Sequence, residues 1–371
     1  MRITGIEAIP VDVPRTPRVR IASAYGEIPS ARFVLVVVRT DDGITGLGEA
    51  SPELDWTGED IHSCWNCIRY YLAPALIGHD PLRIQSAMDR MEVVIAMNPY
   101  AKAAVEMALW DIAGKQAGLP LAELWGGRVR EAVDVKFVVS GPPERAGELA
   151  NQVLAEGFRY IKIKTGLDVR QDIKRVRAVR DAVGEEIPVG VDSNMGWSYA
   201  EALWALPRLE EQGVAFIEQP FNRYPHAALA EYRRLSRIPI VAHESLFTLD
   251  DALQLLTDRA ADIWAITPST HGGYLATREI LGLARAGQIP CLLGSTIELG
   301  INSAFMAHIG LSSPSIDGTV PSDVIGPFYH ERDIVQQRFE LENGAVVPPE
   351  GPGLGVSLDD DAVEAYRIDK G

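Results

Sequence analysis

Cysteine is scarce in this sequence, and the few cysteines present cannot build a disulfide framework. Only three occur, Cys64, Cys67 and Cys291, and an odd count this low is typical of a reducing compartment, so we expect a cytoplasmic protein. Cys64 and Cys67 stand three residues apart in an amphipathic run, which places both on one face of a predicted helix. Since no second ligand pair accompanies them, we interpret them as buried helix residues and not as a zinc or redox site.

The sequence also lacks long apolar runs and an excess of positive charge. No stretch reaches the ~18 uninterrupted apolar residues of a membrane span, and Met1–Pro10 lacks the basic and then apolar layout of a signal peptide. Lys and Arg number 35 against 51 Asp and Glu, which gives a formal net charge of -16. Such a surface repels nucleic-acid phosphates and anionic lipids, so we expect neither as a partner. A small anionic substrate remains compatible, because a local cluster of cations can oppose the global field.

No glycine-rich dinucleotide-binding turn follows a predicted strand, which argues against the alternative of an open, doubly wound sheet. From about residue 133, β-branched runs alternate with amphipathic helical runs. Repeated βα units imply a parallel sheet, and seven or more favour a closed (β/α) barrel. The predicted strands are Val133–Val139, Tyr160–Lys164, Ile187–Asp192, Ala215–Glu218, Ile240–Glu244, Ile263–Thr267 and Cys291–Gly294, and the clearest helices are Val169–Val183, Tyr199–Gln212 and Ala276–Ala286.

The N-terminal section has a different, α+β pattern. A chain of 371 residues exceeds one ordinary compact domain and suits a large barrel with an accessory domain. The tail from about Val324 predicts short strands and turns that return to this section. The N-terminal predictions are strands at Arg2–Val13, Arg32–Thr40 and Ile44–Glu49, a long loop at Arg15–Arg32, and helices at Ile61–Leu72, Pro81–Met97 and Ala101–Gln116.

Four ionisable residues end four consecutive predicted strands: Lys164, Asp192, Glu218 and Glu244. They stand 28, 26 and 26 residues apart, about one βα unit each. Because the C-terminal strand ends of a barrel converge on one mouth, we expect these residues to share a small space. Three carboxylates there would repel each other unless a cation joined them, and oxygen-only ligands favour Mg²⁺. The alternative is that each acid caps a helix or pairs on the surface.

Lys162 and Lys164 alternate along one predicted strand and therefore point to the same side. We expect that side to be the barrel interior, because a lysine in the helix layer would be an unpaired buried charge. Two ammonium groups near a divalent cation disfavour each other's charge, which is expected to lower the pKa of one of them toward neutrality. Lys164, at the strand tip, is the predicted base, and Lys162 is predicted to tune it and to contact the substrate carboxylate. The alternative is a surface lysine pair.

The ordered set of motifs resembles the muconate-lactonizing-enzyme and mandelate-racemase branch of the enolase superfamily almost end to end. The matching segments are Tyr100–Lys115, Leu124–Gly127, Ile161–Lys164, Val191–Asn194 with Gly196 and Trp197, Ile217–Pro220, Gly272-Gly273 and Gly294–Glu298. The resemblance implies a modified (β/α)7β barrel over residues 126–323, an α+β capping domain over residues 1–125, and a C-terminal segment, residues 324–371, that returns to the capping domain. It also implies a homo-oligomer, between a dimer and an octamer.

The resemblance further implies Mg²⁺ on Asp192, Glu218 and an acid from the fifth strand, with Asn194 in support of these ligands. The implied chemistry is abstraction of the proton α to a carboxylate, with the metal holding the enolate oxygens. The sequence departs from the muconate-type pattern at the fifth strand, where His243-Glu244-Ser245 replaces Asp-Glu-Ser. We assign Glu244 to the metal, as in the mandelate-racemase-like branch, and keep His243 as an alternative ligand or a group beside the ligands.

A second departure concerns the face opposite Lys164. The muconate-type group has a lysine at the end of the sixth strand, where this sequence has Thr267, and a threonine cannot act as a base near neutral pH. His271 and His243 are candidates for a second acid or base, although His271 precedes a glycine pair and a helix-capping role is the favoured interpretation for it.

A site with one base suits syn elimination or its reverse, so we expect a lyase that dehydrates a hydroxy acid, or a cycloisomerase of the muconate type. The alternatives are a racemase or epimerase of amino-acid derivatives, with His271 or His243 as second base, and a small-acid-binding barrel without turnover. Weaker candidates for contact with the small carboxylate substrate are Thr267, Ser295, Glu298, Asp323, Tyr25, Arg18, Arg20 and Trp56.

Overall fold

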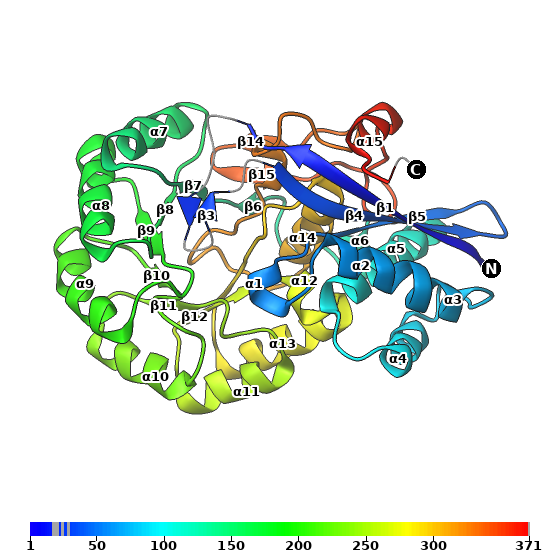
Figure 1. Cartoon of the computed structure of the whole chain (residues 1–371), viewed down its shortest axis with the longest axis horizontal. Helices are drawn as coiled ribbons and strands as arrows, with labels where there is room; N and C mark the ends of the chain where they lie inside the picture. The colour runs from blue at the N-terminus through cyan, green and yellow to red at the C-terminus, as the bar shows by residue number, and fades with distance from the viewer. Residues whose placement is uncertain (17–21, 24–25, 28–29, 370–371) are drawn as a thin grey trace.

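A curled sheet of seven parallel strands forms the larger part of the molecule. The computed structural model describes residues 1–16, 22–23, 26–27 and 30–369. The strands follow one another around the sheet in chain order, and helices cover their outer side (Figure 1). They are β7 (Phe137–Val139), β8 (Ile161–Lys164), β9 (Val189–Asp192), β10 (Ile217–Glu218), β11 (Ile240–Ala242), β12 (Ile263–Ile266) and β13 (Cys291–Leu293).

Residues 316–323 occupy the eighth position and close the sheet into a barrel. Ile316 forms a parallel bridge with Cys291 of β13, and Ser322 forms one with Val135 just before β7. The Asp323 N–H also donates to the Leu293 carbonyl at 2.7 Å. The predicted modified (β/α)7β barrel is therefore confirmed, with an eighth segment that is held by isolated bridges instead of a long strand.

The barrel helices begin at well-placed polar caps. Ser198 and Thr248 each form a reciprocal capping box at the start of α9 and α11, and Asp168 accepts two backbone N–H groups at the start of α8. The predicted bounds of α8 are confirmed to the residue. The helices are α7 (Pro143–Ala155), α8 (Val169–Val183), α9 (Tyr199–Glu211), α10 (His226–Leu235), α11 (Leu249–Asp258), α12 (Pro268–His271), α13 (Tyr274–Gly287) and α14 (Gly300–Ser312).

A capping domain with an antiparallel sheet lies beside the barrel, at the right of Figure 1, and the C-terminal helix returns to it. Its strands are β1 (Ile3–Pro14), β4 (Ser30–Thr40) and β5 (Thr45–Ala50), and its helical segments are α1 (Leu54–Thr57), α2 (Ile61–Cys67), the π-helical η2 (Ile68–Leu72), α3 (Ala73–Leu76), α4 (Ile84–Val94), α5 (Pro99–Ala117) and α6 (Leu121–Leu124). The other elements are β2 (Ala22–Ser23), β3 (Gly26–Glu27), β6 (Val133–Asp134), the 3-10 helix η3 (Gly326–Phe328), β14 (Glu340–Glu342), β15 (Ala345–Val347) and α15 (Asp360–Tyr366). The predicted domain boundaries at residues 125 and 323 stay a prediction.

Four sequence predictions were wrong in detail. The tail, predicted to form short strands and turns, also contains the helix α15. The predicted strand Val133–Val139 is two strands, since β6 pairs with β15 in a separate sheet while β7 enters the barrel. The predicted helix Ile61–Leu72 changes to a π-helical turn at Ile68. The predicted loop Arg15–Arg32 contains the short β2–β3 hairpin. Periodicity misses the first of these breaks because β6 pairs with β15, which lies near the other end of the chain.

Close backbone contacts pack β5 against α5 within the capping domain, and a buried carboxylate of β5 joins this domain to the barrel. A Cβ on Gly46 or Gly48 of β5 would overlap carbonyl oxygens of α5, so these glycines let the two elements touch. Glu49 of the same strand contacts the barrel: it accepts hydrogen bonds from the N–H groups of Leu299 and Asn302 at 2.7 and 3.0 Å, at the start of α14. Burial raises the pKa of Glu49 to about 8.

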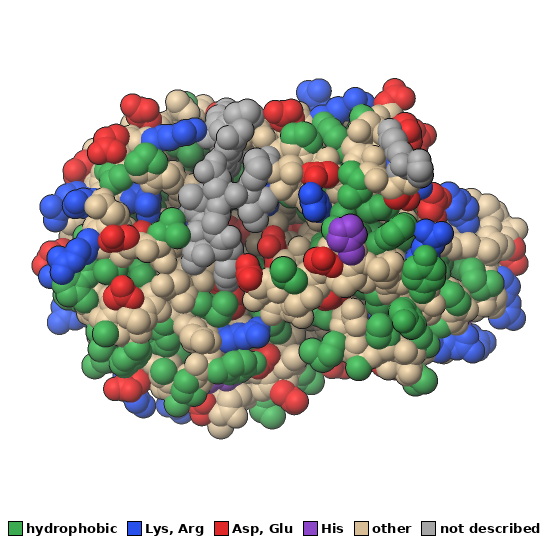
Figure 2. Space-filling view, viewed as in Figure 1, with side chains coloured by type: hydrophobic (Ala, Val, Ile, Leu, Met, Phe, Trp, Pro, Cys, Tyr) green, Lys and Arg blue, Asp and Glu red, His purple; other side chains and the backbone are tan. Residues whose placement is uncertain are grey.

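The cysteines are buried and many charged side chains lie on the surface, in agreement with the composition. Cys64, Cys67 and Cys291 are buried and free, as predicted for the first two. Acidic and basic side chains are interspersed over the face shown in Figure 2. In the part of the chain that the structure describes, no helix combines the length and the apolar character that a bilayer crossing needs.

The barrel interior depends on Gly190, because a Cβ there would lie 2.1–2.5 Å from ring atoms of Phe216. We predict that Gly190→Ala lowers the free energy of unfolding by about 1–3 kcal/mol, measured by urea denaturation. Phe216→Leu in the same chain should restore part of the loss. The control is Gly5→Ala, whose added Cβ meets nothing within 4 Å. Equal stability of the two alanine variants would contradict this packing.

Candidate active site

The candidate site continues the inward-facing side of the barrel strands. Apolar side chains from four neighbouring strands pack together inside the barrel: Phe216, Val241, Ala265 and Leu292. A residue of the site follows each of them two positions later in the chain, at the end of a strand or directly after it: Glu218, His243, Thr267 and Gly294. Since alternate residues of a strand face the same side, the apolar core continues directly into a polar mouth at the C-terminal strand ends.

Lys164 lies at the tip of β8 and is partly buried. Its Nζ donates to Asp192 Oδ2 at 2.6 Å and to Asn194 Oδ1 at 2.5 Å. The Asn194 side chain donates in turn to Glu244 Oε1 at 2.9 Å, and its backbone N–H donates to Asp192 Oδ1 at 3.0 Å. The structure thus brings together Lys164, Asp192 and Glu244 through Asn194, which sits in the left-handed region at φ 43°.

Lys162 lies one layer deeper and faces three carboxylates. Its Nζ is 2.7 Å from Asp323, 3.3 Å from Glu218 and 3.6 Å from Asp192. Burial lowers the pKa of Lys162, but the charges of Asp323, Glu218 and Asp192 outweigh it and raise this pKa well above its usual range. The lysine repulsion expected from the sequence is therefore not the dominant interaction at Lys162, because acids from other strands surround it.

His243 directly follows β11 and lies next to Glu218. Its Nδ1 donates to Glu218 Oε1 at 2.9 Å, since a carboxylate only accepts, and its Nε2 lies 2.8 Å from Thr267 Oγ1. Burial lowers the pKa of His243, but the hydrogen bond and charge of Glu218 raise it above the ordinary value overall. The space for this contact comes from Gly294, whose Cβ would lie 2.4 Å from Nε2.

His271 is tied to the backbone and not to the mouth. Its Nε2 accepts from the Thr267 N–H at 3.2 Å, so its Nδ1 carries the proton and donates to the Phe247 carbonyl at 3.0 Å. Burial lowers the pKa of His271 to about 4. Through these two hydrogen bonds, His271 connects the end of β12 to the loop after β11. The proposed cap of the next helix is wrong, because the N-cap residue of α13 is Gly273 and no side-chain hydrogen bond caps this helix.

Asp192, Glu218 and Glu244 form an oxygen-only donor set at the ends of neighbouring strands. Each is at most 1% exposed, and Asp192 pairs with Glu218 in the β9–β10 register. This donor chemistry fits Mg²⁺. Within the described residues, no three acidic, His or Cys side chains already converge as a metal centre, and the ammonium groups of Lys162 and Lys164 contact Asp192 and Glu218 instead. An arriving dication would therefore replace part of these ammonium contacts.

The remaining acidic candidates differ in their partners. Asp323 faces Lys162 and, at 3.0 Å, Lys136. Burial raises the pKa of Asp323, but these two ammonium groups lower it overall. Glu298 accepts from Ser295 Oγ at 2.6 Å and from the Thr296 N–H at 2.8 Å, and burial raises its pKa. Ser295 and Glu298 thus shape the loop after β13.

Of the candidates in the N-terminal loops, the structure places one. Trp56 of α1 is buried, and its ring meets the His243 ring edge-on at 4.9 Å between centroids. The capping domain therefore reaches the mouth through Trp56. Arg18, Arg20 and Tyr25 lie outside the described residues.

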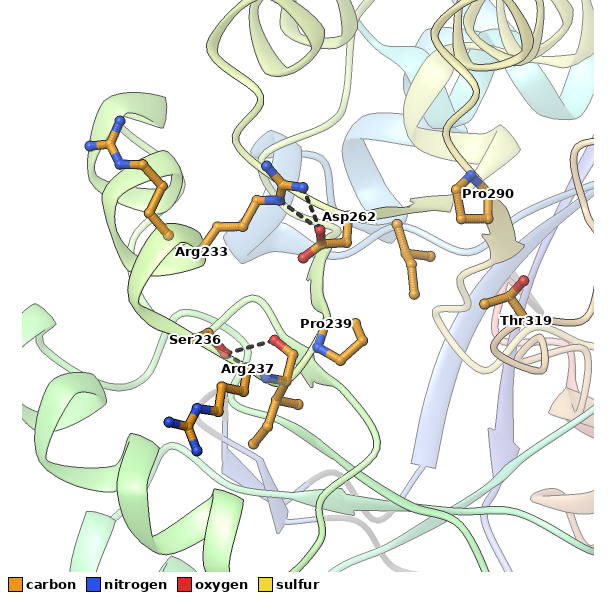
Figure 3. A pocket seen from close by; sticks show the side chains of 10 residues that line it. Arg233, Ser236, Arg237, Pro239, Asp262, Pro290 and Thr319 are labelled. Carbon is orange, nitrogen blue, oxygen red and sulfur yellow. Dashed lines mark hydrogen bonds and ion pairs between the residues drawn. The ribbon is translucent and has the colours of Figure 1, made fainter.

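The opposite end of the barrel offers no comparable set of groups in the hollow drawn in Figure 3. This hollow lies where β11 and β12 begin, between Pro239 and Asp262. Arg233 there is bound to Asp262 at 2.6 Å, and Arg237 points away from that pair (Figure 3). Polar groups at the N-terminal end of a barrel usually serve stability.

Three residues near the site were not predicted from the sequence: Lys136, Arg15, and Gly294 as the residue that makes room for His243. Lys136 belonged to a predicted strand, but its inward direction depends on the break between β6 and β7. Arg15, after the end of β1, is 5% exposed and lines a hollow with Glu53 and Thr296. In the sequence, Arg15 looks like an ordinary cation at a strand end. Burial raises the pKa of Glu53 to about 7.

Comparison with known proteins places the whole chain. The family model described as mandelate racemase / muconate lactonizing enzyme, N-terminal domain, matches residues 5–126, and the enolase C-terminal domain-like model matches residues 145–362. N-succinyl-L-Arg/Lys racemase of Bacillus cereus is 32% identical over 99% of this chain and 98% of its own. Muconate cycloisomerase 1 of Rhodococcus opacus is 34% identical, also over 99% and 98%.

Solved structures agree over the same length. The 2-chloromuconate cycloisomerase from Rhodococcus opacus has a TM-score of 0.95 and 33% identity, with 100% of both chains covered. The dipeptide epimerase from Cytophaga hutchinsonii, solved with Mg and the dipeptide D-Ala-L-Val, has a TM-score of 0.92 and 30% identity, with 99% of both chains covered.

The buried neutral His271 makes stability depend on pH. Its folded-state pKa of about 4 lies below the ordinary value of 6.5. Its contribution is therefore present above pH 6.5 and is lost as the pH falls toward 4, by up to about 3 kcal/mol. We predict that the difference in unfolding free energy between the wild type and His271→Gln shrinks over this window, as measured by denaturant titration. The exposed His62→Gln is the control, and a difference independent of pH would refute the assignment.

Proposed function

Because the chain belongs to the mandelate racemase/muconate lactonizing enzyme family of the enolase superfamily, we propose that this enzyme removes the proton α to the carboxylate of a small acid by a base on one face. The reaction that fits best is syn elimination, such as dehydration of a hydroxy acid, or a cycloisomerisation of the muconate type. The observation that carries the proposal is the asymmetry of the mouth, with Lys164 on one strand end and Thr267 at the place of a second lysine.

Lys164 is the base in this proposal. It stands at the strand tip, less buried than Lys162, where a substrate at the mouth can reach it. Asp192 and Asn194 hold its Nζ and so fix its direction. Lys162, which faces three carboxylates, stays charged and contributes a cation below the substrate carboxylate.

Asp192, Glu218 and Glu244 would hold the Mg²⁺, with Asn194 linking the first and the last of them. When bound, the ion supplies positive charge beside the substrate carboxylate, which makes the α-proton easier to remove. His243 is not assigned as a ligand, because its Nδ1 donates to Glu218 and its Nε2 is directed to Thr267.

The opposite face supports the one-base reaction. Thr267 uses its backbone N–H on His271 and its hydroxyl on His243. His271 has both nitrogens on backbone groups, so it has none for a substrate. A single lysine can take the α-proton and return it to a leaving group on the same face, which is what syn elimination or its reverse requires.

One observation favours a second candidate, an epimerase of amino-acid derivatives. Thr267, His243 and Glu218 form a continuous series of contacts, at 2.8 and 2.9 Å, on the face opposite Lys164. Such a series can relay a proton to a threonine hydroxyl. The relatives with the names racemase and epimerase are consistent with this alternative.

The test is α-proton exchange in D₂O, followed by ¹H NMR over sugar acids, muconates, dipeptides and N-acyl amino acids with Mg²⁺. We predict exchange or elimination by the wild type, and a loss of about 10²–10⁴-fold in Lys164→Ala because its general base is gone. The matched control is Lys174→Ala, an exposed lysine on α8, which should react as the wild type does.

The configuration of the recovered substrate distinguishes the one-base reaction from the epimerase. Products of elimination or ring closure without inverted substrate support the one-base reaction. Deuterium in recovered substrate of inverted configuration supports the epimerase. Full activity of Lys164→Ala, or no reaction with any acid, would refute the proposal and favour a barrel that only binds small acids.

Metal binding has its own readout. We predict that Mg²⁺ at about 100 times its dissociation constant stabilises the wild type by about 2.7 kcal/mol, measured by thermal unfolding, and that a chelator reverses this. Asp192→Asn should lose the effect because one of three carboxylates is removed. Asp181→Asn on the exposed side of α8 is the control. Equal stabilisation of both variants would place the ion elsewhere.

A further inference from the structure

A third lysine lies inside the barrel, below the candidate site. Lys136 follows β6 just before β7, and its side chain is fully buried. Its Nζ donates to the Pro321 carbonyl at 2.5 Å and lies 3.0 Å from Asp323 Oδ2. Both contacts are to the segment that closes the barrel, so Lys136 joins the first barrel strand to the eighth position.

Packing alone does not account for this charge. A buried ammonium costs several kcal/mol unless it is well paired, and an unbranched apolar side chain would fill the same space without that cost. The centroid of the Phe216 ring lies 5.8 Å from Lys136 Nζ, in the same barrel interior. The Lys136 side chain has no exposure to solvent, and this burial lowers its pKa. The one carboxylate within ion-pair distance among the described residues is Asp323.

Asp323 stands between two lysines. Its Oδ2 is 3.0 Å from Lys136 and 2.7 Å from Lys162, while its backbone N–H is held by the Leu293 carbonyl. Lys162 also faces Glu218 and Asp192. A single ammonium cannot satisfy three buried carboxylates equally, and the nearest one competes most strongly. Lys136 supplies the second cation that Asp323 needs.

We propose that Lys136 is a positioning residue: by holding Asp323 from below, it lets Lys162 keep its contacts with Glu218 and Asp192 beneath Lys164. The inference rests on the proposed function, because Lys162 matters there as the cation under the substrate carboxylate. Without Lys136, Asp323 draws Lys162 toward the closing segment and away from the two strand-end acids. Lys136 itself touches no substrate.

The experiment compares Lys136→Met, Asp323→Asn and the double variant, with the acid that reacts fastest in the D₂O exchange. A displacement of about 1 Å at a catalytic group costs about 100-fold, so we expect Lys136→Met to lower kcat by about 10- to 100-fold at a temperature where the protein is fully folded. In the double variant, Asp323→Asn removes the competing charge, so its kcat should lie within about threefold of Asp323→Asn alone.

The matched control is Lys102→Met, a buried lysine on α5 that pairs with Glu92 at 2.7 Å. It changes the same chemical group, and its kcat should match the wild type. If Lys136 had a purely structural role, Lys136→Met would lower the melting temperature both in the wild type and in the Asp323→Asn variant. At temperatures where the protein is folded, kcat would then stay unchanged, and that outcome would overturn the inference.

A crystal structure of Lys136→Met gives a readout that does not depend on turnover. We expect Lys162 Nζ to keep Asp323 and to lose its contact with Glu218. An unmoved Lys162 would overturn the inference even if the enzyme is active. A wild type without exchange activity would refute the proposed function instead, and the position of Lys162 in the variant would still decide the role of Lys136.

Discussion

The mouth of this barrel depends on the compensation of buried carboxylates by ammonium groups from other strands. Asp192, Glu218 and Asp323 are almost without exposure, and all three contact Lys162. Burial of carboxylates without such partners would cost more than a domain can supply. Burial raises the pKa of Asp192, but the ammonium groups of Lys164 and Lys162 lower it overall, and a divalent cation requires ionised carboxylate ligands. Stability and proposed function therefore rest on one set of contacts.

Two glycines make this arrangement sterically possible. Gly190 leaves room for the Phe216 ring below the mouth, and Gly294 leaves room for His243 to reach Thr267. Apolar side chains fill the barrel up to Phe216, and the next inward position of that strand is Glu218. The inward-facing side chains thus change from apolar to charged within two residues. The carboxylates therefore lie next to apolar side chains, which solvate them poorly. Such surroundings strengthen every electrostatic contact at the mouth.

Much of the architecture could be predicted from the sequence, and the reasons for the exceptions are specific. The bounds of α8 follow from a polar cap, an amphipathic period and a glycine stop, all of which are local. The split of Val133–Val139 into β6 and β7 is not local, because β15 from the far end of the chain pairs with the first part. Among site residues, Lys164, Asp192, Glu218 and Glu244 do meet at one mouth. Their roles as base and metal ligands stay predictions.

The sequence by itself determined which residues end the barrel strands and, through their alternation, which of them share a side. It could not determine which groups face each other across the barrel, because such contacts depend on register and closure between strands far apart in the chain. Only the tertiary structure directed His271 to the backbone, His243 to Glu218 and Lys136 to Asp323. Burial and these contacts together shift the pKa of each buried group, and both arise only when the chain folds.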